Sequence, residues 1–226
     1  MLRQPIITKD GSHTISMPEM NVTYHSYHGA IQESMHVFIN AGLIPLISAQ
    51  QEPLNILEMG FGTGLNALLT LVEAEKFKYS IHYTTIELFP LPPEEVISLN
   101  YCNQLNRQEL QPVFQQLHTC EWEKDIALTS FFTIHKSKNS LLNFTISKLQ
   151  NLIYYDAFSP SVQPELWTKE IFEKIYPMLL PGGVLVTYCS KSDVRRAMQA
   201  AGFIIKKIPG PRGKREMVRA VKASGE

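Results

Sequence analysis

Cysteine and long apolar runs are both scarce in this sequence. The three cysteines, Cys102, Cys120 and Cys189, are scattered and form no C-x-x-C pair, which argues against a disulfide framework and a cysteine-based zinc site. No apolar run approaches the roughly 18 residues that a membrane span needs, and residues 1–13 lack the apolar stretch of a signal peptide. We therefore expect a cytoplasmic protein with no membrane segment and no metal.

Glycine and proline are present in ordinary amounts, 12 and 14 residues of 226, so collagen-like and low-complexity chains are excluded. The composition is 44% hydrophobic and 19% charged, which is enough apolar material for a full core and far from that of a disordered chain. A length of 226 residues makes one globular domain the first expectation.

The formal net charge is zero, yet the charge is unevenly distributed along the chain. Residues 191–222 hold ten Lys or Arg against two acidic residues, a local excess of eight positive charges. A basic segment on a neutral protein suggests a polyanionic partner, although a merely solvated basic surface would give the same pattern.

From residue 54 onward, short apolar strands alternate with helical patterns, which predicts a mostly parallel sheet covered by helices on both faces. Ligands bind such sheets at the carboxyl ends of their strands. Expected strands are 54–59, 81–86, 130–135, 152–155 and 184–188, with a terminal antiparallel hairpin of 203–208 and 216–221. Expected helices are 65–74, 93–99, 164–180 and 192–201.

Residues 1–50 differ from the rest and are interpreted as an N-terminal extension to a domain of residues 51–226. Strand-like segments at 5–8 and 13–16 flank Asp10-Gly11, a hairpin turn signal. A helical pattern then covers residues 28–41, and Gly42 is expected to end that helix.

Three glycines in a G-x-G-x-G pattern join the first strand of the domain to its first helix. Glycine allows a positive φ and close approach of the backbone to a ligand. Glu58 precedes the loop, where it would repel a pyrophosphate but suit a cation, and Glu87 ends the next strand, where it could accept both hydroxyl hydrogens of a ribose. This combination favours S-adenosylmethionine, while a nicotinamide cofactor or a structural turn remains an alternative. The expected cofactor-binding residues are Glu58, Gly60, Phe61, Gly62, Gly64, Asn66 and Glu87.

Asp156 ends the strand at 152–155, on the edge of the sheet where ligands are expected, and Phe158 follows it. A carboxylate there could orient an attacking amine and stabilise the positive charge that develops on its nitrogen. The aromatic ring could stack on a base. Asp156 is therefore the candidate catalytic residue, although a turn or helix-capping role would also place an aspartate there. Further candidates for substrate binding are Tyr24, His25, Glu33, Phe158, Arg195, Arg196, Lys214 and Arg215.

These residues lead to a known family. The chain resembles the methyltransferase half of the bacterial bifunctional tRNA 5-methylaminomethyl-2-thiouridine enzyme, and more closely its free-standing forms. The similar segments span nearly the whole sequence: Asp10–Thr14, Tyr24–Ser26, His28–Ser34, Glu58–Asn66, Asp156–Pro160, Pro164–Trp167, Pro181–Gly183, Val194–Arg196 and Gly213–Met217.

The resemblance implies a class I methyltransferase fold of Rossmann-like topology, with a seven-stranded sheet. It implies methyl transfer from S-adenosylmethionine to the amine of 5-aminomethyl-(2-thio)uridine at the wobble position of tRNA, giving the 5-methylaminomethyl form. By the same resemblance, the glycine loop and Glu87 hold the cofactor and Asp156 faces the amine.

The sequence departs from the family in two places. Near residues 136–142 the family usually has an acidic residue that could bind adenine, whereas this chain offers only Asn139 or Ser140. No FAD domain is expected within these 226 residues, so the chain should act on the aminomethyl form and not on the carboxymethylaminomethyl form.

Two other functions remain possible at this stage. An aminopropyltransferase of the spermidine-synthase kind also joins an amine to a sulfonium ligand, but the basic block at residues 191–222 disfavours a cationic polyamine substrate. A catalytically inert tRNA-binding module is disfavoured by the intact glycine loop together with Glu87 and Asp156.

Overall fold

The computed structural model describes residues 2–49 and 53–224. Its central feature is an eight-stranded sheet in the order β10-β11-β9-β8-β4-β5-β7-β6. The run from β9 to β7 is parallel, whereas β6 and β11 pair antiparallel with their neighbours β7 and β9. The strands are β4 (Leu54–Met59), β5 (Ile81–Ile86), β6 (Asp125–Ala127), β7 (Phe132–Ser137), β8 (Gln150–Tyr155), β9 (Leu179–Thr187), β10 (Ile204–Pro209) and β11 (Glu216–Val221).

The predicted mostly parallel sheet and its terminal hairpin are confirmed, but the expected count of seven strands is wrong. The additional strand, β6, has only three residues, too few to show an alternating apolar pattern. It forms because its backbone pairs with the outer edge of β7, from Asp125 opposite His135 to Ala127 opposite Thr133.

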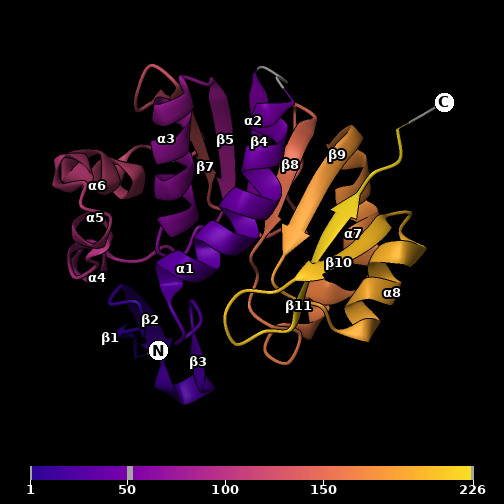
Figure 1. The fold of residues 1–226 in the computed structure, drawn as a ribbon, viewed down its shortest axis with the longest axis horizontal. Coiled ribbons are helices and arrows are strands. Elements are labelled where there is room, and N and C mark those ends of the chain that lie inside the picture. Colours follow the sequence, from indigo (N-terminus) through magenta and orange to yellow (C-terminus); the bar gives the residue numbers. More distant parts are fainter. Residues whose placement is uncertain (1, 50–52, 225–226) are drawn as a thin grey trace.

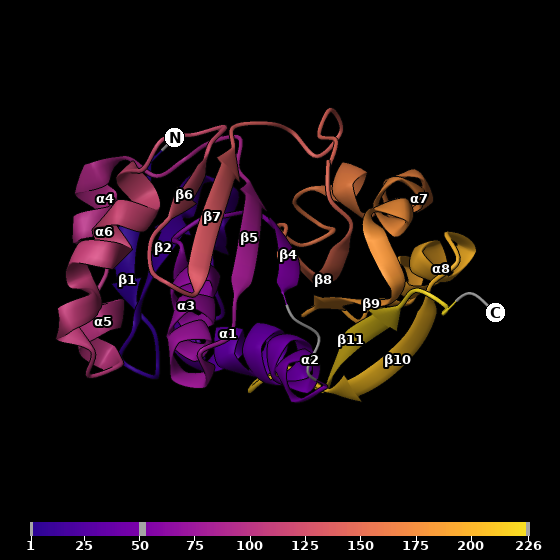
Figure 2. The same ribbon diagram turned by 90° about the horizontal axis from the view of Figure 1, so that it is seen from above.

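Helices cover both faces of the sheet (Figures 1 and 2). Because successive side chains of a buried strand point to opposite faces, β8 contributes Tyr154 to one hydrophobic core and Tyr155 to the other. Figure 2 shows α1, α2 and α3 on one side of the sheet and α7 and α8 on the other. The helices after β4 are α3 (Leu65–Phe77), α4 (Pro93–Ile97), α5 (Tyr101–Gln104), α6 (Gln111–Thr119), α7 (Lys169–Ile175) and α8 (Ser192–Ala200).

The expected helix at residues 28–41 extends further than its sequence pattern suggested. It runs through α1 (Ala30–Ser34), a π-helical stretch (Met35–Leu43) and α2 (Ile44–Ser48). Gly42 does not end the helix, which continues into α2. It lies instead against the sheet, since a Cβ there would be 3.1 Å from Val186 Cγ2 and 3.3 Å from Leu152 Cδ1. The missing side chain lets the helix approach the sheet closely.

This 19-residue helix is long and apolar enough to cross a membrane by length and composition, although no run of purely apolar residues of that length occurs in it. In the fold, 56% of its 18-residue window is buried. Its buried side chains, among them Phe38 and Leu43, belong to the core on one face of the sheet, a position that core helices of soluble proteins share.

Residues 164–180, expected as one helix, are divided into shorter pieces. A 3₁₀ turn at Pro164–Trp167 precedes α7, and a second one at Tyr176–Met178 leads directly into β9. The break falls at Thr168, whose backbone is extended (φ −87°, ψ 164°). Its hydroxyl oxygen caps α7 by accepting a hydrogen bond from the Ile171 amide.

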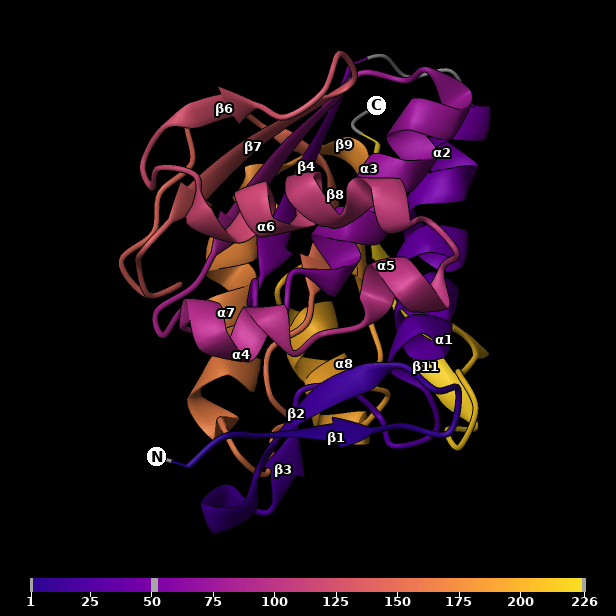
Figure 3. The ribbon, with the colours of Figure 1, turned by 90° about the vertical axis from the view of Figure 1, so that its left-hand side faces the viewer.

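The N-terminal segment forms a separate three-stranded sheet of β1 (Gln4–Ile7), β2 (His13–Met17) and β3 (Val22–Thr23). Figures 1 and 3 show it at the end of the main sheet toward which the parallel strands run. The predicted turn at Asp10-Gly11 is confirmed: Gly11 has φ +85° and Asp10 Oδ1 accepts the Ser12 amide at 3.0 Å. The predicted boundary between residues 50 and 51 lies outside the described residues.

Candidate functional site

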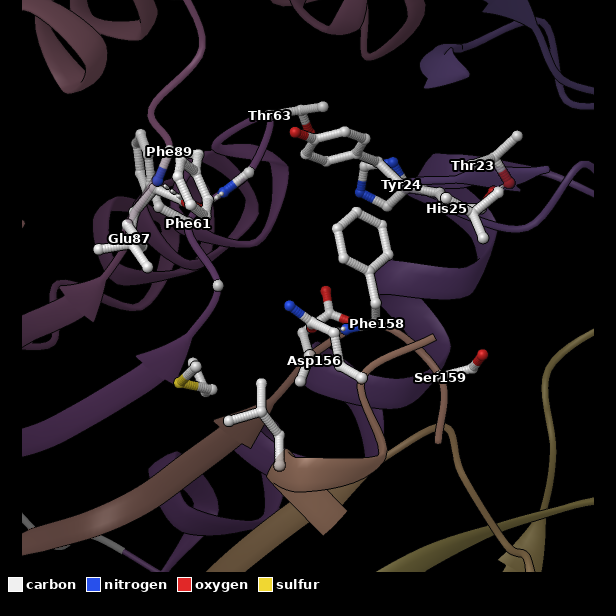
Figure 4. A pocket seen from close by; sticks show the side chains of 18 of the residues that line it. Thr23, Tyr24, His25, Phe61, Thr63, Glu87, Phe89, Asp156, Phe158 and Ser159 are labelled. Carbon is white, nitrogen blue, oxygen red and sulfur yellow. Dashed lines mark hydrogen bonds between the residues drawn. The ribbon is translucent and has the colours of Figure 1, made fainter. Parts of the chain in front are cut away.

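A cavity of about 910 Å³ lies between the carboxyl ends of the parallel strands and the N-terminal sheet. Segments far apart in the chain line it: residues 3, 17, 20–26 and 33 of the extension, the glycine loop, the segments that follow β5, β7 and β8, Tyr188 and Lys214. Figure 4 shows Glu87 and Phe89 on one side, Tyr24 and His25 on the other, and Asp156 and Phe158 between them.

The glycine loop between β4 and α3 has a backbone that only glycine adopts without strain. Gly60, Gly62 and Gly64 have φ values of +90°, +49° and +71°. Space is limited as well: a Cβ on Gly62 would lie 3.0 Å from the Tyr24 ring, and one on Gly64 would lie 2.8 Å from His118 Nε2. The loop therefore forms part of the cavity wall through its bare backbone.

Glu87 immediately follows β5 and lines the cavity. Its two carboxylate oxygens accept backbone hydrogens, Oε2 from Gly62 at 3.0 Å and Oε1 from Phe89 at 2.8 Å. Each oxygen keeps a second lone-pair direction that could take a hydroxyl of a ribose. The carboxylate thus connects the glycine loop to β5 and remains able to bind a ligand.

Glu58 has a different position from the one expected. It is completely buried in β4 and is not among the residues that line the cavity. Its Oε1 accepts a hydrogen bond from Asn66 Nδ2 at 3.0 Å, and its Oε2 accepts one from Thr85 Oγ1 at 3.0 Å. Burial raises the pKa of Glu58 to about 8, despite the opposing hydrogen bonds from Asn66 and Thr85.

The raised pKa of Glu58 makes stability depend on pH. Above the ordinary carboxyl pKa of 4.5 the unfolded chain releases this proton, whereas the folded protein keeps it until about pH 8. The stability associated with Glu58 is therefore fully present below 4.5 and is lost as the pH rises through 8, by up to about 1.4 kcal/mol per pH unit. Glu58→Gln keeps a neutral side chain of the same shape, so its free energy of unfolding should lack this component.

Urea unfolding of both proteins from about pH 5 to about pH 8 measures the effect. The free energy of unfolding of the wild type minus that of the variant should fall as the pH rises. Glu58→Gln also removes the charge that raises the pKa of Asp156, so the difference reports the titration of the two coupled carboxyl groups together. Two parallel pH curves would show that Glu58 is ionised in the folded protein throughout.

Asp156 follows β8 and lines the cavity. Its Oδ2 accepts a hydrogen bond from Asn66 Nδ2 at 2.9 Å, and its Oδ1 accepts none from any residue that the structure describes. Burial raises the pKa of Asp156 well above its usual value, and the nearby charges of Glu33 and Glu58 raise it further, against the opposing effects of Asn66 and Lys214. This carboxylate is therefore a stronger base than an exposed one.

Two aromatic side chains meet beside Asp156. The Tyr24 and Phe158 rings are edge-to-face with centroids 5.3 Å apart, as Figure 4 shows. The backbone of Phe158 is fixed on both sides, since its carbonyl accepts Trp167 Nε1 at 2.7 Å and its amide donates to Gln163 Oε1 at 3.2 Å. Phe158 lines the cavity, and these two hydrogen bonds hold its backbone at the edge of the sheet where ligands are expected.

His25 lines the cavity from the extension and is 8% exposed. Its ring nitrogen Nδ1 lies 3.0 Å from Thr14 Oγ1, and that hydroxyl also accepts the His25 amide at 3.1 Å. Burial lowers the pKa of His25 to about 4, so the imidazole is neutral near neutral pH.

Glu33 of α1 and Lys214 of the β10–β11 loop form an ion pair across the cavity wall, with Lys214 Nζ 2.7 Å from Glu33 Oε1. Glu33 Oε2 also accepts the Ser26 amide at 2.7 Å, and Lys214 Nζ lies 3.9 Å from the centre of the Tyr188 ring. The pair joins segments 181 residues apart. Glu33 and Lys214 thus both belong to the same end of the cavity as Asp156, because both charges affect its pKa.

The other basic candidates lie outside the cavity. Arg195 Nε donates to the Ser190 carbonyl at 3.2 Å, and Arg196 pairs with Asp193 on the exposed side of α8. Arg215 is exposed in the loop that carries Lys214. Both Arg195 and Arg215 lower the pKa of Glu216, so the two guanidinium groups lie in one neighbourhood.

Residues 139–142 line the cavity beyond the end of β7, so Asn139 and Ser140 lie in its wall. Asn139 Oδ1 accepts the Ser140 amide at 2.8 Å. The sequence reasoning missed further lining residues. Among them, Phe89 and Tyr188 follow strands at the carboxyl edge, where strand ends carry the ligand-binding residues, and this signal could have indicated both. No three His, Cys, Asp or Glu side chains of the described ranges converge into a possible metal site.

The topology and the cavity together define a class. The glycine loop after β4, the acidic residue after β5 and a cavity at the carboxyl edge are the features of a nucleoside-binding α/β enzyme. A sequence comparison then identifies the family: residues 101–223 match the S-adenosyl-L-methionine-dependent methyltransferases, and this chain belongs to that family. Its cofactor is S-adenosylmethionine, which the bare glycine loop and the free lone pairs of Glu87 fit.

Curated relatives are bifunctional proteins. The chain is 30% identical to the tRNA 5-methylaminomethyl-2-thiouridine biosynthesis bifunctional protein MnmC of Cupriavidus metallidurans, over 96% of this chain and 33% of that protein. It is 27% identical to MnmC of Cupriavidus necator, over 96% of this chain and 34% of that protein. The chain therefore spans about a third of the length of these relatives.

Two solved structures share the fold. MnmC2 from Aquifex aeolicus superposes with a TM-score of 0.80 at 23% identity, over 98% of this chain and 71% of that one. Spermidine synthase from Thermotoga maritima superposes with a TM-score of 0.53 at 14% identity, over 99% of this chain and 69% of that one. Both likenesses concern the fold alone, and they confirm the predicted methyltransferase-type architecture.

Proposed function

We propose that this protein transfers a methyl group from S-adenosylmethionine to the amine of 5-aminomethyl-(2-thio)uridine at the wobble position of tRNA. The observation that carries the proposal is the position of Asp156, a base of raised pKa beside the glycine loop of a methyltransferase. The similarity to MnmC supports the choice of tRNA and of this nucleoside. The alternative readings from the sequence, an aminopropyltransferase or an inert binding module, gain no specific support from the site.

The cavity is suited to a cationic amine next to a planar base. Asp156 and Glu33 supply two carboxyl groups at one end, where the Lys214 cation already pairs with Glu33. Arg3 is a second cation of the cavity wall, and it pairs with Glu95. The Tyr24 and Phe158 rings offer an aromatic surface on which an unstacked base could rest. A volume of about 910 Å³ leaves room for a nucleoside beside the cofactor.

The chemistry needs a neutral nitrogen with its lone pair aimed at the methyl group, which the bound cofactor supplies as an electrophilic sulfonium methyl. Asp156 Oδ1 faces the cavity and can accept one N–H of the amine, which orients the nitrogen. As the C–N bond forms, positive charge develops on that nitrogen, and the carboxylate stabilises it. The raised pKa of Asp156 lets it take up the released proton.

The glycine loop, Phe61 and Glu87 are the proposed cofactor-binding residues, with Asn139 or Ser140 near the adenine. Glu58 is proposed to act on the site indirectly, from beneath the loop. Its carboxyl group does not line the cavity, but it accepts a hydrogen bond from Asn66, which does. In the cell we place this reaction in the cytoplasm, where tRNA is modified.

The direct test incubates the purified protein with labelled S-adenosylmethionine and tRNA that carries the aminomethyl group, and then separates the nucleosides. Label should appear in 5-methylaminomethyl-(2-thio)uridine. A tRNA transcript without the aminomethyl group is the matched substrate control and should remain unlabelled. Absence of label from the wobble nucleoside, or aminopropyl transfer to putrescine from decarboxylated S-adenosylmethionine, would refute the proposal.

The basic residues outside the cavity are proposed to bind the phosphates of the tRNA. Replacing Arg195, Arg196 and Arg215 together by glutamine should weaken tRNA binding and flatten its salt dependence, because each phosphate contact releases counterions. The slope of log K against log salt should fall by about two to three, at about 0.7–0.9 per contact.

Filter binding over a range of salt concentrations measures this slope. The matched control replaces Lys76, Lys78 and Lys148, which are all exposed. They lie in the last turn of α3, directly after α3 and before β8, at the edge of the sheet where the parallel strands begin. Their replacement should leave the slope unchanged. An unchanged slope in the arginine variant would mean that the RNA docks elsewhere.

A further inference from the structure

One amide links two carboxyl groups at the site, that of the buried Glu58 and that of Asp156 in the cavity wall. Asn66 Nδ2 donates to Glu58 Oε1 at 3.0 Å and to Asp156 Oδ2 at 2.9 Å. An amide nitrogen has only two hydrogens, so both are used. Asn66 is 3% exposed in the first turn of α3, and Glu58 is completely buried in β4.

The orientation of this amide is determined by its carboxyl partners. Turning it over would place Asn66 Oδ1 against two carboxyl oxygens, where at most a protonated one could donate. In the observed orientation Oδ1 is buried without a partner among the described residues. The fold thus accepts an unpaired acceptor, a cost of about 1–3 kcal/mol, in order to present both N–H groups to Glu58 and Asp156.

Glu58 is itself held in place from the other side. Its Oε2 accepts a hydrogen bond from Thr85 Oγ1 on the neighbouring strand β5. The sequence of contacts therefore runs from Thr85 through Glu58 and Asn66 to Asp156. Oδ1 of Asp156 accepts no hydrogen bond from the described residues and is free to meet a ligand.

We propose that Glu58 and Asn66 are positioning residues, which hold the Asp156 carboxylate in the orientation that receives the substrate amine. Glu58 then acts on the methyl-accepting side of the reaction rather than as a direct ligand of the cofactor. The proposal rests on the proposed amine methylation at Asp156. Its physical basis is that a freely rotating carboxylate seldom presents the correct oxygen, and misplacement of a reacting group is costly in rate.

Two substitutions of Glu58 separate shape from hydrogen bonding. Glu58→Leu fills a similar volume but offers no acceptor to Asn66, so kcat with aminomethyl tRNA should fall about tenfold or more. The dissociation constant of S-adenosylmethionine, measured by calorimetry, should stay within about twofold. Glu58→Gln can still accept from Asn66 Nδ2 and should restore most of the lost rate.

The decisive measurement is a double-mutant cycle with Asp156→Ala. In that background Glu58→Leu should change single-turnover methylation by less than about twofold, because no carboxylate remains to be positioned. Asn66→Ala should behave in the same way, and it provides an independent test if Glu58→Leu fails to fold, as judged by circular dichroism.

Three results would overturn the inference: wild-type kcat in Glu58→Leu, a full additional loss in the Asp156→Ala background, or weakened cofactor binding at unchanged kcat. The last of these would make Glu58 a cofactor contact. These results are distinguishable from failure of the proposed function, because in that case the wild-type protein itself would methylate no tRNA.

Discussion

Asp156→Ala should lower kcat by about 100-fold or more while leaving the affinity for S-adenosylmethionine nearly unchanged. An alkylamine with a pKa near that of lysine, about 10.4, is only about 0.1% neutral near pH 7.4, which adds roughly 4 kcal/mol to the barrier. Methyl transfer therefore depends on a group that orients the neutral amine and stabilises the ammonium as it forms.

The structure gives Asp156 the properties that this role requires. Burial and the charges of Glu33 and Glu58 raise its pKa, so its carboxylate binds a proton more tightly than an exposed aspartate would. The ionised form is the active one, and kcat should therefore rise with pH through the raised pKa of Asp156. In Asp156→Ala the part of the pH dependence that comes from Asp156 should disappear, while deprotonation of the amine should still raise kcat with pH.

Steady-state kinetics with aminomethyl tRNA, together with calorimetry of cofactor binding, provide the measurement. Asp156→Asn keeps an oxygen that can accept from Asn66 but carries no charge. If its kcat falls as far as that of Asp156→Ala, the lost rate is due to the missing charge. Glu94→Ala, at an exposed residue of α4 that does not line the cavity, is the surface control and should match the wild type. If Asp156→Ala kept more than about half of its turnover, Asp156 would not be the amine-facing group.

The parts of the fold that could be predicted are those in which local pattern and packing agree. The strands β4, β5 and β8 are rich in apolar residues and mostly buried, because both faces of the sheet are covered. The glycine loop after β4 has the backbone that its pattern indicates. Residues 101–119 gave no helical signal, since α6 buries only Phe114 and Leu117 among polar neighbours. Gly42 misled the prediction because close packing and helix termination both favour glycine.

The parts of the site that could not be predicted depend on contacts between distant segments. The end-of-strand rule placed Glu87 and Asp156 at the cavity, because parallel strands end at one edge. The rule could not show that Glu58 points beneath the loop, because the alternation of a strand assigns a side chain to a face but not to a partner. Nor could it show that Glu33 pairs with Lys214, since this contact exists only after the extension and the terminal hairpin have packed together.

The Glu87 carboxylate combines a structural and a binding contribution. It accepts the amides of Gly62 and Phe89 and so holds the glycine loop against the end of β5. If the same oxygens also accept ribose hydroxyls of the cofactor, removal of the carboxylate affects binding twice. The ribose loses a charged acceptor, and the loop that forms the cavity wall loses its connection to the sheet.

Glu87→Ala should therefore weaken S-adenosylmethionine binding by about 1–3 kcal/mol, a rise in the dissociation constant of about 5-fold to 150-fold. Calorimetry on the purified protein measures this directly, without tRNA. Glu94→Ala is the matched control, because Glu94 is exposed in α4 and does not line the cavity. Glu87→Gln should fall between the two, since its amide oxygen can accept one backbone hydrogen while its NH₂ group opposes the other. Unchanged affinity in Glu87→Ala would remove Glu87 from the cofactor site and would place the ribose against a different part of the cavity wall.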